Sequence, residues 1–319
     1  MLLIVQIPCH NEEAGIGPVI RAIPRSIAGV DRVEALVIDD GSTDGSVAAA
    51  RAAGADHVVR FSGRRGLARA FEAGIDAGLR LGADIIVNID ADGQYAAEEI
   101  PRLIEPILVG RADAVIGDRG IAADADYPPL KKSLQVAGSW TVRALSGTAV
   151  TDAASGFRAW TREAALKLHL VSDFSYTLES LISAGKDRLR VESVPVSARP
   201  VARPSRLFRS MPEYLRKSAA TLVRAYALYE PLRVFALIGG AIFSGGFLIG
   251  LWFVYYYLFE GGKGHVQLLI LSAVLLIIGF QVLVMALLAD LIGANRKLLG
   301  DLLYRVKRLE TRPETPPKP

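Results

Sequence analysis

The sequence predicts an α/β domain with a mostly parallel sheet, followed by a helical segment that crosses a membrane twice. Two observations indicate the α/β domain: strand-like and helix-like runs alternate over residues 2–117, and polar residues directly follow several of the strands. A third observation indicates the membrane segment, because residues 234–259 and 266–289 form two long runs without a charged residue.

Composition sets the outer limits. The chain has 319 residues, of which 51% are hydrophobic, so it can form one large domain plus an appendage and is too apolar to be disordered. The formal net charge is +4, and basic residues gather in 188–233 and 296–308. A single cysteine, Cys9, excludes a disulfide framework within the chain. The N-terminus lacks a basic region before its apolar run, so no cleavable signal peptide is expected and the first domain is expected in the cytoplasm.

The predicted elements follow from local pattern. Apolar runs predict strands at residues 2–8, 34–40, 56–61 and 113–117, and a fourth-in-order strand that starts at 85 and ends on Asp90 and Asp92. Helices are expected between them, at about 16–27, up to about 53, up to about 82 and at about 98–109. Ser42 or Thr43 is expected to cap the second of these helices.

Polar residues follow the strands at the carboxyl edge, where open α/β sheets bind ligands. They are His10, Glu12, Asp39, Asp40, Asp90, Asp92 and Arg119. Acidic turn residues placed by chance would occur at both edges, so the concentration at one edge predicts a ligand site. In extended backbone, Asp90 and Asp92 leave the same face and can share one divalent cation. No GxGxxG motif and no P-loop motif is present, which argues against a dinucleotide-binding fold and against a P-loop nucleotide-binding fold.

Four motifs occur in order over roughly the first 210 residues. They are PCHNE at 8–12, DDGSTDG at 39–45, DADGQ at 90–94 and SGFR at 155–158. In order and spacing they resemble family 2 glycosyltransferases with the GT-A fold, most closely the dolichol-phosphate mannose synthase and polyprenyl-phosphate glycosyltransferase branch. His10 is a departure, because that branch often has tyrosine there.

The resemblance implies a nucleotide diphosphate sugar as donor and Mg²⁺ or Mn²⁺ as cofactor. The residues implied for donor binding are Pro8, His10, Glu12, Asp39, Asp90, Ala91, Asp92, Arg203 and Arg206. The metal would be held by Asp90, Asp92 and Gln94, whose oxygen atoms suit either ion. The prolines of 199–206 keep that segment out of a helix, so Arg203 and Arg206 fit a basic arm that closes on the diphosphate or a tether at a membrane surface.

The resemblance also implies an acceptor phosphate bound by Arg119, Lys132 and Ser139, after a loop at 121–129 and on a helix at 130–145. Asp92, Arg119 and Asp152 are the residues expected to act at the reacting atoms, with Asp152 facing the sugar. For Arg158 we expect a structural role. A helix at 174–185 is expected to place Glu179 beneath the site, in a role that the sequence leaves undecided.

Four segments are expected: a GT-A domain at 1–209, an interfacial amphipathic helix at 210–231, a transmembrane hairpin at 232–290, and a C-terminal helix with a disordered tail at 291–319. Basic residues flank both spans on one side and only one lysine lies between them, so both termini are predicted in the cytoplasm of a cell-membrane protein. The glycine pair at 246 and 250, like the leucine-bearing C-terminal helix, is compatible with packing of the hairpin or a homo-oligomer. That C-terminal helix could also be interfacial.

The expected function is inverting transfer of a hexose, of the GDP-mannose or UDP-glucose type, to polyprenyl phosphate in the membrane. One alternative is a hydroxyl-bearing lipid or polysaccharide acceptor, which would require a base such as Asp152 or Glu179. Another is a non-catalytic membrane scaffold that kept the fold. No nucleic-acid partner is expected.

Overall fold

The computed structural model describes residues 1–120, 129–168, 170, 176–199, 231–261 and 265–311. The chain divides into two compact units. The first contains residues 1–221 together with 301–319, and the second contains residues 222–300. Arg203, Arg206 and the interfacial helix expected at 210–231, apart from Pro231, lie outside the described residues.

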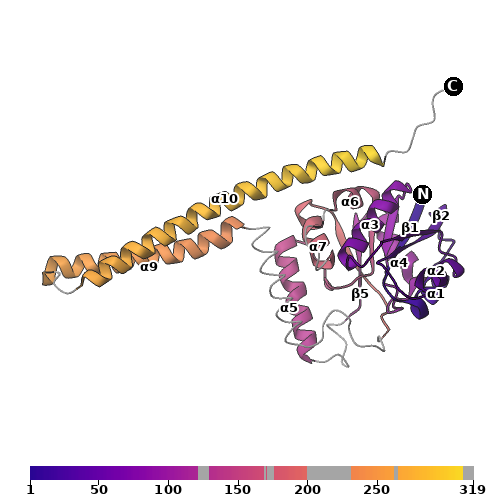
Figure 1. The fold of residues 1–319 in the computed structure, drawn as a ribbon, viewed down its shortest axis with the longest axis horizontal. Coiled ribbons are helices and arrows are strands. Elements are labelled where there is room, and N and C mark those ends of the chain that lie inside the picture. Colours follow the sequence, from indigo (N-terminus) through magenta and orange to yellow (C-terminus); the bar gives the residue numbers. More distant parts are fainter. Residues whose placement is uncertain (121–128, 169, 171–175, 200–230, 262–264, 312–319) are drawn as a thin grey trace, which may run out of the picture. The chain divides into compact units, whose positions relative to one another are not determined.

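The first unit is built on a seven-stranded mixed sheet with the strand order β3-β2-β1-β4-β6-β5-β7 (Figure 1). The strands are β1 (Leu2–Cys9), β2 (Arg32–Asp39), β3 (His57–Arg60), β4 (Ile85–Asn88), β5 (Ala114–Asp118), β6 (Arg158–Thr161) and β7 (Val191–Pro195). All pairings are parallel except those of β6, which is antiparallel to both neighbours. The predicted α/β class is confirmed, and β6 and β7 are additions that the sequence did not indicate.

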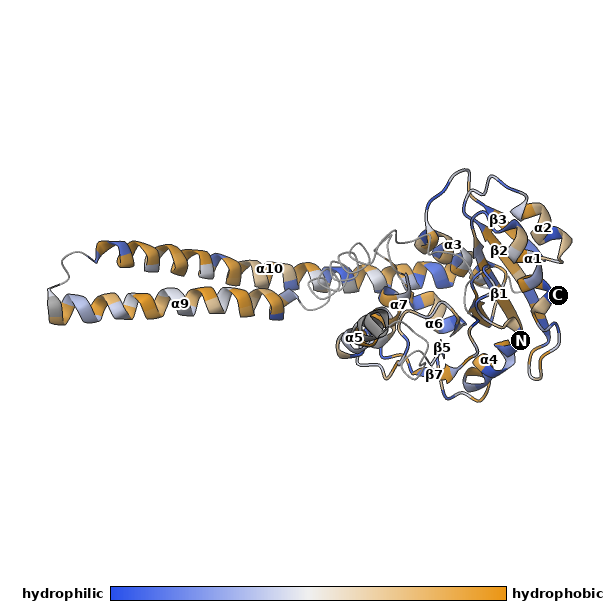
Figure 2. Cartoon of the chain, turned by 90° about the horizontal axis from the view of Figure 1, so that it is seen from below, coloured by the Kyte–Doolittle hydropathy of each residue, from blue (hydrophilic) through white to orange (hydrophobic). Residues whose placement is uncertain are grey.

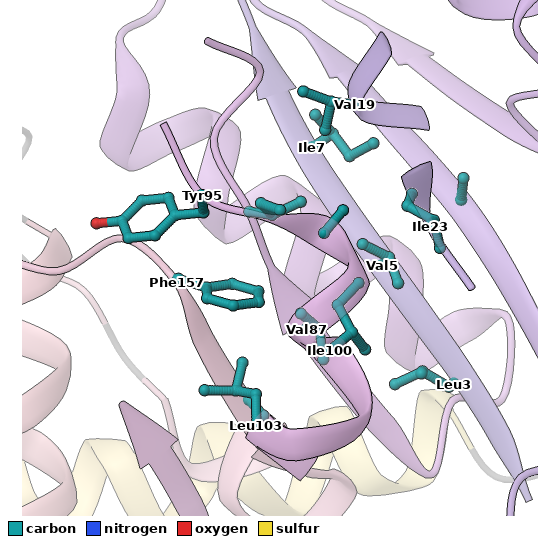
Figure 3. Close-up of a cluster of buried hydrophobic side chains, with 14 of the residues drawn as sticks. Leu3, Val5, Ile7, Val19, Ile23, Val87, Tyr95, Ile100, Leu103 and Phe157 are labelled. Atoms are coloured by element: carbon teal, nitrogen blue, oxygen red, sulfur yellow. The ribbon is translucent and has the colours of Figure 1, made fainter. Parts of the chain in front are cut away.

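Helices cover both faces of the sheet. They are α1 (Glu13–Ala22), α2 (Ser46–Ala52), α3 (Leu67–Arg80), a short 3₁₀ turn at Ala97–Glu99, α4 (Ile100–Leu108), α5 (Pro129–Ser146), α6 (Arg162–Lys167) and α7 (Tyr176–Lys186). Alternate residues of β1 point to opposite faces, so Leu3, Val5 and Ile7 join the core with α1 and α4, which Figure 3 shows. Ile4 instead joins the core with α3, α6 and α7.

The cap expected for the second helix is wrong. Helix α2 begins at Ser46, after Gly45, and neither Ser42 nor Thr43 bonds to its first turn. The Asp44 carboxylate accepts the Ser46 backbone N–H at 3.0 Å instead. Ser42 is drawn away because its hydroxyl accepts the Asn11 backbone N–H at 2.9 Å. A side chain that caps the loop toward β1 cannot also cap the helix.

The second unit is a pair of apolar helices, coloured mainly orange in Figure 2. Helix α9 is Pro231–Glu260 and helix α10 is Val266–Glu310, and both are long and apolar enough to cross a membrane. Gly246 and Gly250 pack the pair, since a Cβ atom at Gly246 would lie 2.8 Å from the Leu275 Cβ atom and one at Gly250 would lie 2.7 Å from the Ser272 hydroxyl.

The last ten residues of α10, 301–310, belong to the first unit. Tyr304 donates its hydroxyl to Glu163 of α6 at 2.9 Å, and the Lys307 ammonium lies 2.8 Å from the Asp76 carboxylate of α3. The Arg162 guanidinium donates to the backbone carbonyl of Thr311. The end of α10 is therefore fastened to the helices that cover one face of the sheet. The expected segment boundary at residue 290 lies inside this unbroken helix.

Candidate active site

The carboxyl edge of the sheet brings three of the predicted motifs together. Strands β1 and β2 are parallel and in register up to the pair of Cys9 with Asp39, so PCHNE and DDGSTDG end side by side. The backbone carbonyl of Asp40 lies 2.8 Å from Nδ1 of His10. Burial and the nearby negative charge of Asp39 raise the pKa of Cys9 to about 12, so this thiol stays protonated and neutral. Cys9 is thus a structural residue of the edge.

Asp39 is fully buried, and within the described residues its Oδ2 atom accepts no hydrogen bond. Its carboxylate accepts the Ser42 backbone N–H at 3.0 Å and lies 3.1 Å from Nε of Arg60 on β3. Arg60 also donates to the Ser42 carbonyl at 3.2 Å. This residue, which the sequence analysis did not single out, closes the outer side of Asp39.

Asp40 holds a loop. The Asp40 carboxylate accepts the backbone N–H groups of Arg65 and Gly66, the latter at 2.9 Å, immediately before α3. Gly41 has φ of +67°, and a Cβ atom there would lie 2.6 Å from the Gly63 carbonyl carbon. Only glycine allows this close approach. The DDG motif therefore positions the loop before α3 next to the site.

The PCHNE motif reaches the DADGQ motif through the start of α1. Pro8 is buried within β1, and the backbone N–H of Glu12 donates to the Ser46 hydroxyl at 2.7 Å. A Cβ atom at Gly15 would lie 2.7 Å from the backbone carbonyl oxygen of Ala91. Ala91 itself is buried. The structure thus places Glu12, Ala91 and the two aspartates of DADGQ in one region.

The aspartates Asp90 and Asp92 follow a strand that ends earlier than expected. Strand β4 stops at Asn88, and residues 91–93 form a turn in which the Gln94 backbone N–H donates to the Asp92 carboxylate at 3.0 Å. The extended backbone expected for both aspartates is therefore wrong, because Asp92 folds back over the turn. Burial first, and then the charge of Asp92, raise the pKa of Asp90 to about 7.

The chemistry of these donors suits a hard divalent cation. Among the described residues no group of three or more His, Cys, Asp and Glu side chains is placed to hold a metal. Mg²⁺ and Mn²⁺ do not need one, because such ions bind through one or two carboxylates together with waters and substrate phosphates. A buried carboxyl with a raised pKa beside a second carboxylate is the arrangement that a cation relieves. Asp90, Asp92 and Gln94 therefore fit a divalent metal.

The SGFR motif lies directly against Asp90. A Cβ atom at Gly156 would lie 2.5 Å from Oδ2 of Asp90, so the fit requires glycine. The Gly156 carbonyl accepts from the Asn88 side-chain amide at 2.7 Å, and its N–H donates to the Tyr95 hydroxyl at 3.0 Å. Tyr95 also contacts the Ser155 hydroxyl at 3.3 Å. Tyr95 and Asn88 are positioning residues that the sequence analysis missed; the one signal was their place on either side of DADGQ.

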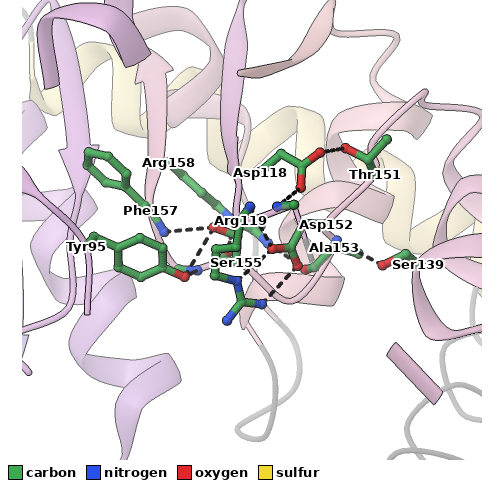
Figure 4. A network of polar contacts seen from close by, with 12 residues as sticks. Tyr95, Asp118, Arg119, Ser139, Thr151, Asp152, Ala153, Ser155, Phe157 and Arg158 are labelled. Atoms are coloured by element: carbon green, nitrogen blue, oxygen red, sulfur yellow. Dashed lines mark hydrogen bonds and ion pairs between the residues drawn. The ribbon is translucent and has the colours of Figure 1, made fainter. Parts of the chain in front are cut away.

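Arg119 and Asp152 form a two-bonded ion pair, shown in Figure 4. Nε and Nη2 of Arg119 donate to the two carboxylate oxygens of Asp152 at 2.7 and 2.9 Å, and both side chains are largely buried. The positive charge of Arg119 also acts on Asp90 and lowers its pKa, against the larger effect of burial. Two of the three residues expected to act at the reacting atoms thus lie together, and Arg119 lies close enough to Asp90 for its charge to act on that carboxyl.

Arg158 has the structural role that was expected of it. It is fully buried and donates to the carbonyls of Ala153, Ser155 and Thr177 and to the Ser180 hydroxyl, at 2.7–2.8 Å. Burial lowers its pKa to about 10, which leaves it charged at neutral pH. It therefore joins the 153–155 loop to α7, the helix that also carries the buried Glu179.

Helix α5 contributes Ser139, whose hydroxyl accepts the Ala153 backbone N–H at 3.2 Å. Ser139 therefore lies beside the loop that carries Asp152. Lys132 belongs to the first turn of the same helix, and its side chain is outside the described part of the structure.

Comparison with known proteins supports this picture. The model of glycosyl transferase family 2 matches residues 4–168. A polyprenol monophosphomannose synthase of Mycolicibacterium smegmatis is 34% identical over 174 residues, and the match covers 52% of this chain and 64% of that protein, less than two thirds of its length. An undecaprenyl-phosphate mannosyltransferase of Micrococcus luteus is 31% identical over 62% of this chain and 83% of its own. The glycosyltransferase AglJ of Haloferax volcanii is 29% identical over 95% of this chain and 96% of its own.

A solved structure is similar in fold. Glucosyl-3-phosphoglycerate synthase from Mycobacterium tuberculosis, in complex with Mn²⁺, UDP and glucosyl-3-phosphoglycerate, matches with a TM-score of 0.55 and 26% sequence identity. The match covers 71% of this chain and 78% of that one. The mixed, mostly parallel sheet is thus shared with nucleotide-sugar enzymes of the GT-A class.

Proposed function

Because this chain belongs to glycosyl transferase family 2, we propose that it transfers a hexose from a nucleotide diphosphate sugar to a polyprenyl phosphate at a membrane, with inversion at the anomeric carbon. The single observation that carries the choice of acceptor is the Arg119–Asp152 ion pair beside Asp90. Family membership, with relatives named as a synthase and a mannosyltransferase, favours an enzyme over the scaffold alternative.

The donor is proposed to bind across the ends of β1, β2 and β4. Asp39 would accept an N–H or hydroxyl donor of the nucleoside, and His10 and Glu12 would line the same edge. The related structure contains UDP and Mn²⁺, which supports a nucleotide donor and a divalent metal for this chain. Relatives named for mannose transfer support a hexose donor. The proposed donor is a nucleotide sugar of the GDP-mannose or UDP-glucose type.

The metal is proposed to be Mg²⁺ or Mn²⁺, held by Asp90, Asp92 and Gln94. When bound, it supplies positive charge against the diphosphate that departs. A bound cation would offset the energetic cost of a buried negative charge on Asp90, and this favours ionisation of its carboxyl at neutral pH. Tyr95 and Gly156 keep the Asp90 side chain in place, and Arg203 and Arg206 are proposed to close on the diphosphate from the other side.

The acceptor phosphate is proposed to lie near Arg119, Lys132 and Ser139. A phosphate monoester has a second pKa near about 6 and attacks without a general base. A hydroxyl acceptor would need one, and Asp152 is a poor base while both its oxygens accept from Arg119. Asp152 is better suited to orient the Arg119 guanidinium. The names of two relatives contain the words polyprenol and undecaprenyl-phosphate, and these names support a polyprenyl phosphate as acceptor.

The direct test uses membranes that contain the full chain. Radiolabelled GDP-mannose, UDP-glucose and their relatives are offered in turn with one polyprenyl phosphate, and lipid-linked products are resolved by thin-layer chromatography. We expect one nucleotide sugar to label the lipid, with no product in chelator and none from Asp92→Asn. Labelled product with the free alcohol polyprenol but none with its phosphate would contradict the proposal.

The acceptor and donor pockets should also separate in kinetics. A charge-assisted contact to phosphate contributes about 1.5–3 kcal/mol, so its loss weakens binding about tenfold or more. Lys132→Ala is expected to raise KM for polyprenyl phosphate and leave nucleotide binding by calorimetry unchanged. Arg206→Ala is expected to weaken nucleotide binding directly. The reverse pattern would mean that the acceptor enters from the side of residues 199–206.

A further inference from the structure

The C-terminal half of α10 carries an exposed apolar seam with heptad spacing. Its residues are Ile292, Asn295, Leu299, Leu302, Val306 and Leu309. Their spacings alternate between three and four residues, and the five apolar side chains are 47–69% exposed. This alternation is that of the a and d positions of a coiled coil. Met285 and Leu288, also exposed, continue the same spacing toward the N-terminal half.

A different face of α10 packs against α9. Ser272, Gly279 and Ala286 share one heptad position, next to the a position of the seam. The Ser272 hydroxyl donates to the Gly246 carbonyl at 2.8 Å, and a Cβ atom at Gly279 would lie 2.6 Å from the Phe243 backbone nitrogen. Ala286 is buried. The hairpin contact therefore does not cover the seam.

The contact with the catalytic unit also leaves the seam exposed. Lys307, which pairs with Asp76, continues the heptad position of Ala286. Tyr304, which donates to Glu163, occupies the position on the far side of the helix from a and d. Within the described residues, these two contacts use the side of α10 that turns away from Leu302 and Val306, and a third, the ion pair of Glu310 with Arg80 of α3 at 3.7 Å, lies at the edge of the seam.

The length of α10 argues against the bilayer as the cover. The helix runs unbroken over 45 residues, or about 68 Å, which exceeds the hydrocarbon thickness of about 30 Å. If residues 266–289 span the membrane, the seam extends about 27 Å beyond it. A helix that lies in the headgroup layer would first have to turn, and α10 has no break at which to do so. The leucines of the seam therefore need a protein partner.

We infer that the seam joins two copies of this chain as a parallel, two-stranded coiled coil. Two copies inserted in the same membrane have the same topology, so their α10 helices run in the same direction. Asn295, at a d position, then meets Asn295 of the other copy, whereas a shifted register would bury each amide against an apolar side chain without a hydrogen-bond partner. Arg305 and Glu310 flank the seam at the g and e positions, where the arginine of one helix faces the glutamate of the other. Glu310 lies 3.7 Å from Arg80 of its own chain, but its side chain is 57% exposed and its carboxylate can meet a second cation.

A cysteine scan in native membranes tests this pairing. Single cysteines at 299, 301, 302, 303, 306 and 309 of the full chain are oxidised, and disulfide-linked dimer is measured on gels. Disulfides need Cβ atoms within about 4 Å, so we expect dimer from Leu299→Cys, Leu302→Cys, Val306→Cys and Leu309→Cys. The matched neighbour Asp301→Cys should give no more than the wild type. Wild-type Cys9 is a suitable background because it is buried and its pKa is raised to about 12.

A second arm tests the orientation. In the Leu309→Cys background, Arg305→Glu places two glutamates opposite each other and is expected to lower the dimer yield, whereas Arg308→Glu makes the same charge change off the seam and should not. Equal effects of the two variants would overturn the parallel register. A flat crosslinking profile across the scan, or no dimer at any seam position, would overturn the interface and leave the seam to another partner or to lipid.

Discussion

At the scale of single residues, Asp90 has a carboxyl that suits a cation but costs free energy to ionise because it is buried. Its carboxyl lies beside Asp92 and under Gly156, and its pKa is raised to about 7 by burial and by that second carboxylate. Glycine at 156 allows the approach and Arg119 offsets part of the penalty. The neutral carboxyl of Asp90 is therefore the more stable form without a cation, and a cation would stabilise the charged form.

The first prediction concerns pH. Between about pH 4 and pH 7 native Asp90 keeps a proton that the unfolded chain has released, so in chelator the free energy of unfolding should fall as pH rises, by about 1.4 kcal/mol per pH unit inside that window. Thermal unfolding midpoints at pH 5 and pH 7.5 measure it. Asp90→Asn should remove the difference, and Mn²⁺ at pH 7.5 should raise the midpoint of the wild type only. The same pH trend in the variant would assign it to other groups.

The second prediction concerns Gly156. In Gly156→Ala the new Cβ atom would lie 2.5 Å from Asp90 Oδ2 and 3.0 Å from the Tyr176 hydroxyl, so the carboxylate proposed to bind the metal must move. Displacements of this size can cost about a hundredfold in rate. Transfer assays should show such a loss, together with weaker Mn²⁺ binding by calorimetry. Gly138→Ala, a glycine of α5 whose added Cβ would meet no described atom within 4 Å, serves as the control and should keep full activity.

At the scale of elements, the loop before β6 illustrates what sequence patterns can and cannot predict. The motif SGFR drew attention to this loop, and the structure places its Gly156 against Asp90. Strand β6 itself, Arg158–Thr161, has only four residues and runs antiparallel between β4 and β5. So short a run has no period of its own, and its place depends on pairing with strands far away in sequence. Likewise, nothing in the sequence indicated that Arg119 and Asp152 would pair.

The third prediction concerns the same loop. Arg158→Leu keeps the bulk but leaves buried acceptors of residues 153, 155 and 177 without their donor, at about 1–3 kcal/mol each. We expect the free energy of unfolding to fall by about 3 kcal/mol or more in denaturant titrations. Arg102→Leu, on the exposed side of α4, should change it by less than about 0.5 kcal/mol. A small loss in both variants would mean that α7 holds the loop without the guanidinium.

At the scale of the whole molecule, composition predicted the two apolar helices, while their boundaries depended on context. The uncharged runs 234–259 and 266–289 lie inside α9 and α10. A leucine-bearing helix was expected from residue 291 as a separate segment, and the structure joins it to the second span as one helix that ends at Glu310. A change from apolar to charged residues does not by itself end a helix. A helix ends at a residue that breaks it or at a competing contact, and Gly293 does not interrupt α10.

The fourth prediction concerns topology. If both helices span the membrane with basic residues on the cytoplasmic side, a cysteine placed within 261–264 should react with an impermeant reagent outside intact cells. A cysteine placed after residue 311 should react only after lysis. Wild-type cells, with buried Cys9 alone, give the background. Labelling of the tail in intact cells would contradict the hairpin.

The fastening of the α10 end to α3 and α6 has a mechanical consequence. The catalytic unit includes chain from both sides of the helical hairpin, residues 1–221 and 301–319, so two covalent connections join it to that hairpin. A chain cut after Gly300 would therefore lose part of the catalytic unit itself and not only a tail.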